Sequence, residues 1–237
     1  ILAEFKSIDS EHQLFRDIKG FEIESKIERS VYNRRKRKLF PFIEEIRMKM
    51  VNKFNELDNY FVVDSMPLEV CKMSRSSRSK ICKDQDYAYP NKGFCASQNL
   101  HFYGYKLHAV CSISGVFQSF DISPASVHDI HYLQDIKLQM SDCVILGDKG
   151  YLSQTIQLDL FNEVNIALET PKRKNQKDYK PQFYQFKKYR KRIETLFSQL
   201  CDQFMIRRNY AKTFEGFKTR ILAKITTLTT IQFLNKF

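Results

Sequence analysis

Three carboxylates in a strongly basic chain are the residues best suited to chemistry. Asp64 ends the apolar run at 60–63, Asp148 ends another at 143–147, and Glu194 follows the cationic segment at 187–192. The formal net charge of +12 attracts polyanions. Acids among so many cations are explained if they bind divalent metal ions at a phosphodiester. Two Mg²⁺ ions about 3.5–4 Å apart can activate a water and stabilise the leaving oxygen.

Each acid taken alone also has an ordinary structural explanation. An Asp that follows an apolar run is commonly a turn or capping residue, and Asp148-Lys149-Gly150 is a common turn sequence. Glu194, which follows several cations, resembles one half of a surface ion pair. The metal-site interpretation therefore depends on the order of the three acids and on the elements that carry them.

Those elements are predicted from apolar periodicity. In chain order they are a helix at 41–55, a strand at 60–64, a hairpin of strands at 105–111 and 116–122, a helix at 126–138, a strand at 143–147, a helix at 153–162, a strand at 166–168, and helices at 193–204 and 214–235. Residues 65–103 show no clear period and are interpreted as an extended loop insertion.

This order of elements predicts a mixed α/β sheet, because antiparallel strands are followed by parallel strands with crossover helices. Asp64 then lies on the first strand, Asp148 at the end of the fourth, and Glu194 on the helix after the fifth. A strand end holds an Asp rigidly, as a metal site requires. We expect Glu194, at the edge of its helix's apolar stripe, to point toward the sheet rather than into open water.

Composition supports a nucleic-acid partner. The 237 residues suit one catalytic domain of roughly 150–200 residues plus an appendage. Lys and Arg number 39 against 27 Asp and Glu, which favours nucleic acid or an anionic membrane surface. No run approaches the roughly 20 apolar residues of a membrane span, so nucleic acid is favoured. Unevenly spread cysteines and the lack of a signal-peptide pattern predict a reduced, cytosolic protein.

Two cationic runs could contact DNA phosphates, at 34–38 and within 172–192. Each could instead be a solvated charge run. The candidate DNA-binding residues are Arg34, Arg35, Arg37, Lys149, Lys172, Arg173, Lys174, Arg190 and Arg192. Arg190 lies one helical turn before Glu194, so it could pair with that acid or hold a phosphate.

Two further groups of side chains have the types for a supporting role. His128 and Asp129 could support the metal-binding acids or simply cap a helix. Cys71, Cys82 and Cys95 have the chemistry of zinc ligands, but their spacings contain no compact Cys-x-x-Cys pair. Buried or spare thiols are the simpler interpretation of these cysteines.

Four short motifs, in this order, resemble those of DDE transposases of bacterial insertion sequences. They are Val62-Val63-Asp64-Ser65-Met66-Pro67-Leu68, Tyr103-Gly104-Tyr105-Lys106-Leu107-His108, Gly147-Asp148-Lys149-Gly150-Tyr151, and Arg192-Ile193-Glu194-Thr195-Leu196-Phe197-Ser198-Gln199-Leu200. The resemblance covers about residues 28–236. It implies an RNase H-like fold with a mixed five-stranded sheet flanked by helices at 58–237, after a short helical, basic N-terminal region at 1–57.

The resemblance also implies a chemistry and its partners. Asp64, Asp148 and Glu194 would be the catalytic triad and would bind two Mg²⁺ ions, for which Mn²⁺ can substitute. The protein would cut DNA at transposon ends and join the cut strand to target DNA. We expect it to bind terminal inverted repeats and target DNA, to act as a homo-oligomer, and to lie in the bacterial cytoplasm with the nucleoid.

The sequence departs from the family pattern in two places. Some related transposases carry a Lys seven residues after the Glu, where this chain has Cys201. The chain begins at Ile1, so we expect part of the DNA-binding region to lie upstream. Two alternatives stay open: an inactive or domesticated DNA-binding remnant, and an RNase H-like nuclease without strand transfer.

Overall fold

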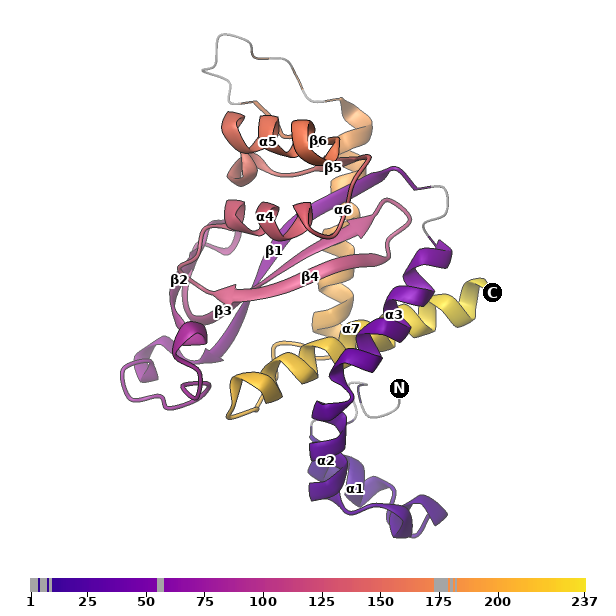
Figure 1. Ribbon diagram of the computed structural model, residues 1–237. Coiled ribbons are helices and arrows are strands. Elements are labelled where there is room, and N and C mark those ends of the chain that lie inside the picture. Colours follow the sequence, from indigo (N-terminus) through magenta and orange to yellow (C-terminus); the bar gives the residue numbers. More distant parts are fainter. Residues whose placement is uncertain are drawn as a thin grey trace.

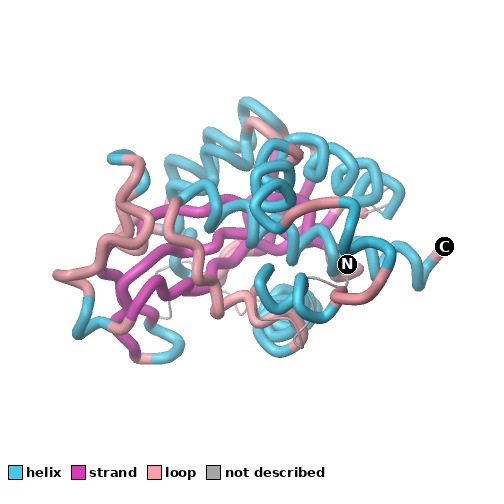
Figure 2. The backbone as a smooth tube through the Cα atoms, turned by 90° about the horizontal axis from the view of Figure 1, so that it is seen from below, coloured by secondary structure: helices cyan, strands magenta, loops and turns pink. Residues whose placement is uncertain are grey.

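The computed structural model of the chain describes residues 4, 8, 10–54, 58–172, 179, 181 and 183–237. Its centre is a mixed β-sheet with helices on both faces (Figures 1 and 2). The strands are β1 (Tyr60–Cys71), β2 (Asn91–Cys95), β3 (Leu100–Ser112), β4 (Phe117–Pro124), β5 (Cys143–Leu146) and β6 (Ile166–Glu169). The helices are α1 (Glu11–Asp17), α2 (Arg29–Lys38), α3 (Phe40–Phe54), α4 (Tyr132–Lys137), α5 (Gln154–Val164), α6 (Tyr184–Asp202) and α7 (Phe214–Lys236).

The sheet has the predicted mixed topology with one added strand. β3 pairs antiparallel with β1 and β4, while β1 pairs parallel with β5 and β5 with β6. β4-β3-β1-β5-β6 is thus the expected five-stranded sheet of an RNase H-like fold. The added strand, β2, pairs with the start of β3. β4 pairs with the rest of the same edge of β3, so β2 and β4 follow one another along that edge.

The prediction of a loop insertion over residues 65–103 was wrong at both ends. β1 continues through Cys71, seven residues beyond Asp64, and stays paired with β3 up to Tyr103. Ser65, Pro67 and Glu69 interrupt this half of β1, so it forms no continuous apolar run. Gly104 permits the pairing, because a Cβ there would lie 2.2 Å from the carbonyl oxygen of Leu68.

Side-chain alternation along β1 explains the layers. Val62 and Met66 point to the face covered by α6 and α7, whereas Phe61 and Val63 point to the face covered by α4 and α5. In Figure 1, α4 and α5 lie in front of the sheet and α6 lies behind it. The apolar stripe predicted on α6 is buried against the first face, at Ile193, Leu196, Phe197 and Leu200.

The N-terminal helices pack onto the rest of the chain. α3 lies beside α7 (Figure 1), and a small core of Val51, Phe54 and Val116 joins them to β4. Arg47 of α3 is fully buried, donates to the carbonyl oxygens of Phe117 (2.7 Å) and Gln118 (3.1 Å), and pairs with Glu44. The division between residues 1–57 and 58–237 stays a prediction.

The longest described helix, α7, is buried along its middle, at 221–225 and 227–229. It runs for 23 residues and begins at Thr213, whose Oγ1 accepts from the backbone N–H of Gly216 at 3.2 Å. Polar side chains such as Thr227 and Lys224 are buried along it. Across the described residues, no helix combines the length and apolar character needed to cross a membrane.

Candidate active site

Asp64 lies on β1, and Asp148 lies just beyond the end of β5, the adjacent parallel strand. β1 and β5 pair up to Val62 and Leu146, and Asp64 and Asp148 each follow two residues later. The charge of Asp148 acts on Asp64, so the two carboxyl groups lie near each other. Side chains two residues apart share a face, and adjacent strands are about 4.8 Å apart. Asp64 therefore belongs to the face of Val62, which α6 covers.

The electrostatics of Asp64 agree with this proximity. Burial is the main cause that raises the pKa of Asp64, to about 7, and the charge of Asp148 raises it further. The backbone N–H of Ser65, which donates to Oδ1 at 2.8 Å, opposes the shift, as does Arg190. Asp64 is thus a half-buried carboxyl beside another acid, with too little nearby positive charge to keep its usual pKa.

The two Asp side chains fit a divalent cation. Asp148 Oδ1 accepts from the backbone N–H of Gly150 at 2.7 Å, much as Asp64 uses its Oδ1. Among the described residues, no hydrogen bond or ion pair occupies the second oxygen of either carboxylate. Carboxylate oxygens are the ligands that Mg²⁺ prefers, and a bound cation would relieve the repulsion between the acids.

Glu194 and Asp64 line the same cavity, which has a volume of about 500 Å³. The expectation that Glu194 avoids open water was wrong, since its side chain is exposed on α6. Asp148 is not among the described residues that line this cavity. Within the described part of the chain, no three His, Cys, Asp or Glu side chains are close enough to hold one metal ion. The three acids are therefore not gathered into a single three-ligand site.

Arg207 is a cavity residue that sequence reasoning missed. It follows α6 in the chain and is the only cation among the described residues that line the cavity of Asp64 and Glu194. It also lies against Cys201, where burial raises the pKa of the thiol and Arg207 lowers it. One arginine among 39 Lys and Arg carries no distinguishing sequence signal.

His128 and Asp129, predicted as a pair, have different surroundings. Asp129 accepts from Lys106 Nζ at 2.9 Å and adds to the rise that burial causes in the pKa of Asp64. His128 is exposed, and its Nδ1 accepts from the backbone N–H of Ile130 at 3.3 Å as a cap. Only Asp129 acts electrostatically on the candidate metal site.

Tyr151 places a buried hydroxyl near the acids. It ends a single 3₁₀ turn at Lys149–Tyr151, directly after Asp148. Its hydroxyl has no hydrogen-bond partner within the described residues. Burial, followed by the charges of Asp129, Asp64 and Asp148, raises its pKa well above the usual value. A neutral hydroxyl beside these acids can donate a hydrogen bond once a ligand rearranges them.

The candidate DNA-binding cations divide between two regions. Arg190 acts electrostatically on Asp64 and therefore lies near the acids, whereas Arg34, Arg35 and Arg37 are exposed on α2, which packs against α1 and α7. Lys149, Lys172 and Arg192 are exposed. Arg173 and Lys174 lie outside the described residues.

The cysteines show no zinc site. Cys71, Cys82 and Cys95 are all free thiols. No metal-holding cluster of three residues includes them within the described ranges. Cys82 is buried, and this burial raises the pKa of its thiol to about 11, so it is a protonated core residue. This agrees with the simpler interpretation of the cysteines as ordinary thiols.

Comparison with protein families agrees with the fold. A family model described as the transposase DDE domain matches residues 56–230. The matched range contains all six described strands, the helices α4 to α6, and the acids at 64, 148 and 194. Searches among curated proteins and among solved structures gave no significant match.

Proposed function

This chain belongs to the transposase DDE domain family, and on that premise we propose that it cuts DNA at transposon ends and transfers the cut strand to target DNA. The observation that carries the proposal is the pairing of Asp64 with Asp148. Asp64 lies on β1 and Asp148 lies just after the adjacent strand β5, and the pKa of the half-buried Asp64 is raised to about 7 by burial and by Asp148. Such a pair supports the binding of a divalent cation.

We propose that Asp64 and Asp148 bind one metal ion. Glu194 would bind a second metal ion, together with Asp64, in the cavity that these two residues line. When bound, two divalent cations, Mg²⁺ or Mn²⁺, supply the charge that activates a water or a 3′-hydroxyl and stabilises the leaving oxygen. Strand β1 would hold Asp64 in a fixed orientation, and the hydrogen bond from the Gly150 N–H would do the same for Asp148. The buried stripe of α6 fixes the position of Glu194 against the same face.

The cations near the acids would position the substrate. Arg190 lies beside Asp64, and Arg207 lines the cavity, so each could hold a phosphate next to the scissile bond. We propose terminal inverted repeats and target DNA as partners, with Lys149, Lys172 and Arg192 contacting the flanking backbone. We also propose that the active form is a homo-oligomer in the bacterial cytoplasm.

Replacing one acid tests the proposal. The variant Asp148→Asn should lose Mg²⁺-dependent nicking of a supercoiled plasmid that carries the gene with its flanking DNA. Because the change removes only one carboxylate charge, DNA binding in EDTA should stay near the wild-type value. Asp142→Asn is a matched control, since Asp142 is exposed in the turn before β5. Full nicking by Asp148→Asn would overturn the assignment.

The exposed position of Glu194 favours one alternative, a DNA-binding remnant without catalysis. Such a protein would bind DNA with steep salt dependence and would nick no plasmid at any Mg²⁺ or Mn²⁺ concentration. A nuclease without strand transfer would nick but would not join DNA ends. Supplying a duplex with a free 3′-hydroxyl and measuring the joined product separates this nuclease from a transposase.

A further inference from the structure

A second cavity, far along the chain from the acids, is lined mainly by cations. It has a volume of about 440 Å³ and lies between α2 and the start of α7. We call it the α2–α7 cavity. The charged residues that line it are Arg29, Lys36, Arg37, Lys212, Arg220 and Glu11. Five cations against one acid leave a strong excess of positive charge in a concave site.

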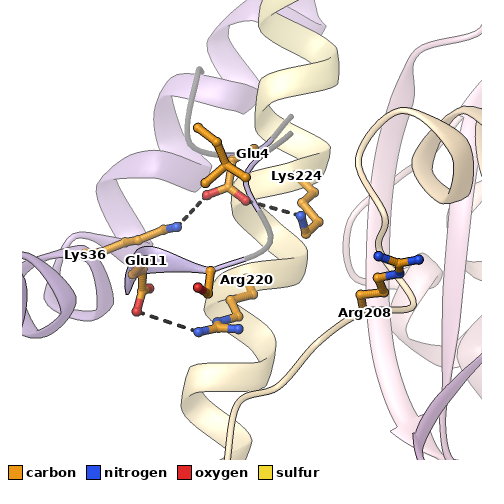
Figure 3. A pocket seen from close by; sticks show the side chains of 8 residues that line it. Glu4, Glu11, Lys36, Arg208, Arg220 and Lys224 are labelled. Atoms are coloured by element: carbon orange, nitrogen blue, oxygen red, sulfur yellow. Dashed lines mark hydrogen bonds and ion pairs between the residues drawn. The ribbon is translucent and has the colours of Figure 1, made fainter. Parts of the chain in front are cut away.

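Ion pairs fix two of these cations in place (Figure 3). Lys36 pairs with Glu4, and Arg220 pairs with Glu11 at 3.6 Å. Glu11 also accepts from the side-chain amide of Asn33. The single acid of the cavity is therefore already engaged, and its charge does not neutralise the remaining cations.

Three cations of the cavity are exposed and unpaired. Among the described residues, no ion pair or hydrogen bond engages the side chains of Arg29, Arg37 or Lys212. Tyr210, which is 66% exposed, adds a hydroxyl to the same wall. Guanidinium groups bind phosphate oxygens through two parallel hydrogen bonds, so this set of side chains suits phosphates.

The side chains, and not the end of α7, make this site. Two of the first-turn amides of α7 already have acceptors, because Phe214 N–H donates to Asp84 at 2.8 Å and Gly216 N–H donates to Thr213. The charge excess therefore comes from side chains of two segments that lie about 180 residues apart in the sequence. Their meeting depends on the packing of α2 against α7.

We propose that the α2–α7 cavity binds the phosphate backbone of duplex DNA, at a site separate from the cavity of Asp64 and Glu194. The inference rests on the proposed function only in taking DNA as the partner, and it needs no metal chemistry. Binding here neutralises phosphates without reading bases, so it adds affinity for any sequence. DNA in this cavity contacts both the N-terminal helices and the domain that carries the acids.

Salt dependence of DNA binding tests the proposal. Affinity for a 30-base-pair duplex is measured in EDTA between 0.05 and 0.3 M NaCl. Each phosphate contact contributes about 0.9 to the slope of log affinity against log salt. The double variant Arg37→Gln/Lys212→Gln should lower that slope by nearly two and should bind about ten- to fiftyfold more weakly at 0.1 M salt. It leaves the ion pairs of Lys36 and Arg220 intact.

The control removes two cations at the other end of α7. Lys53 and Lys236 lie over the rings of Phe233 and Phe54, roughly 33 Å along the helix from Lys212. Lys53→Gln/Lys236→Gln should change the slope by much less than the cavity variant. Equal losses of affinity in the two double variants would show that only the overall positive charge matters. That result would overturn the proposed DNA site in the α2–α7 cavity.

A measurement on the unaltered chain covers the case in which the variant does not fold. Acetylation of lysines by an N-hydroxysuccinimide ester is followed by mass spectrometry with and without the duplex. Lys212 should be protected several-fold by DNA, whereas Lys236 should not. Equal reactivity of Lys212 in both samples overturns the proposal.

These results are separable from those of the nicking assay. Loss of nicking by Asp148→Asn leaves the binding measurement in EDTA unaffected. Suppose that the cavity variant binds like the wild type while Asp148→Asn loses nicking. The proposal that the α2–α7 cavity binds DNA is then wrong, and the proposed function stands. Suppose instead that the cavity variant loses affinity and that neither the wild type nor any variant nicks DNA. The α2–α7 cavity is then a DNA-binding site, and the catalytic proposal is wrong.

Discussion

Two acids in this molecule, Asp64 and Glu4, meet opposite surroundings. Glu4 is buried between α2 and α7 and forms ion pairs with Lys36 and with Lys224, the latter at 3.6 Å. Asp64 is half-buried beside another acid, and Arg190 only partly offsets the burial and repulsion that raise its pKa to about 7. One carboxylate has its countercharges supplied by the chain, and the other does not.

The difference separates a structural acid from a candidate functional one. A buried carboxylate with cationic partners needs nothing further, and removing it leaves those cations unpaired. A carboxylate without such partners costs stability unless an external cation binds. The same residue type therefore indicates either a structural contact or a ligand site, according to the charges that the fold places around it.

The largest expected contrast is in catalysis. Asp64→Asn should reduce Mg²⁺-dependent nicking about a thousandfold, because losing a metal ligand removes roughly 4 kcal/mol of transition-state stabilisation. Glu4→Gln, assayed well below its melting temperature, should nick within about threefold of the wild-type rate, since Glu4 touches neither acid nor cavity of the candidate site. Similar losses in both variants would remove the distinction between the two acids.

The next contrast is in stability, where replacing Glu4 should have the larger effect. Glu4→Gln should lower the free energy of unfolding by about 3 kcal/mol, because Lys36 and Lys224 lose a shared buried partner. Urea denaturation in EDTA measures this loss. The exposed pair of Lys49 and Glu45 supplies the control, for which Glu45→Gln should cost less than about 1 kcal/mol. An unchanged unfolding midpoint in Glu4→Gln contradicts the structural role.

Asp64 should make the metal-free protein less stable as pH rises. Its folded pKa of about 7 is above its unfolded value of 3.8, so the folded state holds the proton more tightly between these values. Stability is therefore lost as pH rises from about 4 to 7. Asp64→Asn should remove that loss and gain about 2 kcal/mol at pH 8 in EDTA, allowing for solvent screening. Parallel stability–pH curves for the two proteins contradict this prediction.

The smallest expected effect concerns Arg207. Arg207→Gln should slow plasmid nicking about tenfold, because one charge-assisted hydrogen bond to a phosphate is worth roughly 1.5 kcal/mol in the reaction. Arg207→Lys should recover part of the rate by keeping the charge. If Arg207→Gln nicks at the wild-type rate, the cation in the cavity does not hold the substrate.

The sequence predicts the backbone of the candidate site well because its strands are buried on both faces. Continuous apolar runs place Asp64 on β1 and Asp148 just after β5, and the register of those strands brings the acids together. The apolar stripe at Ile193 and Leu196 likewise predicts α6. These signals are local, since a few neighbouring residues are enough to reveal them.

The rest of the site depends on contacts between distant segments. The second half of β1 forms no continuous apolar run, and it is a strand because it pairs with β3 about 35 residues later. Glu194 is exposed although its neighbour Ile193 is buried, since a helix turns each residue by a fixed angle. Arg207 and the α2–α7 cavity arise only when separate elements pack together.

The buried guanidinium of Arg47 also affects how copies of this chain can meet. β4 pairs only with β3 among the described strands, so its outer side is an open edge of the kind where sheets of separate molecules join. At the start of that edge, the carbonyl oxygens of Phe117 and Gln118 already accept from Arg47. An incoming strand would have to displace this buried cation, and α3 therefore protects the protein against edge-to-edge aggregation.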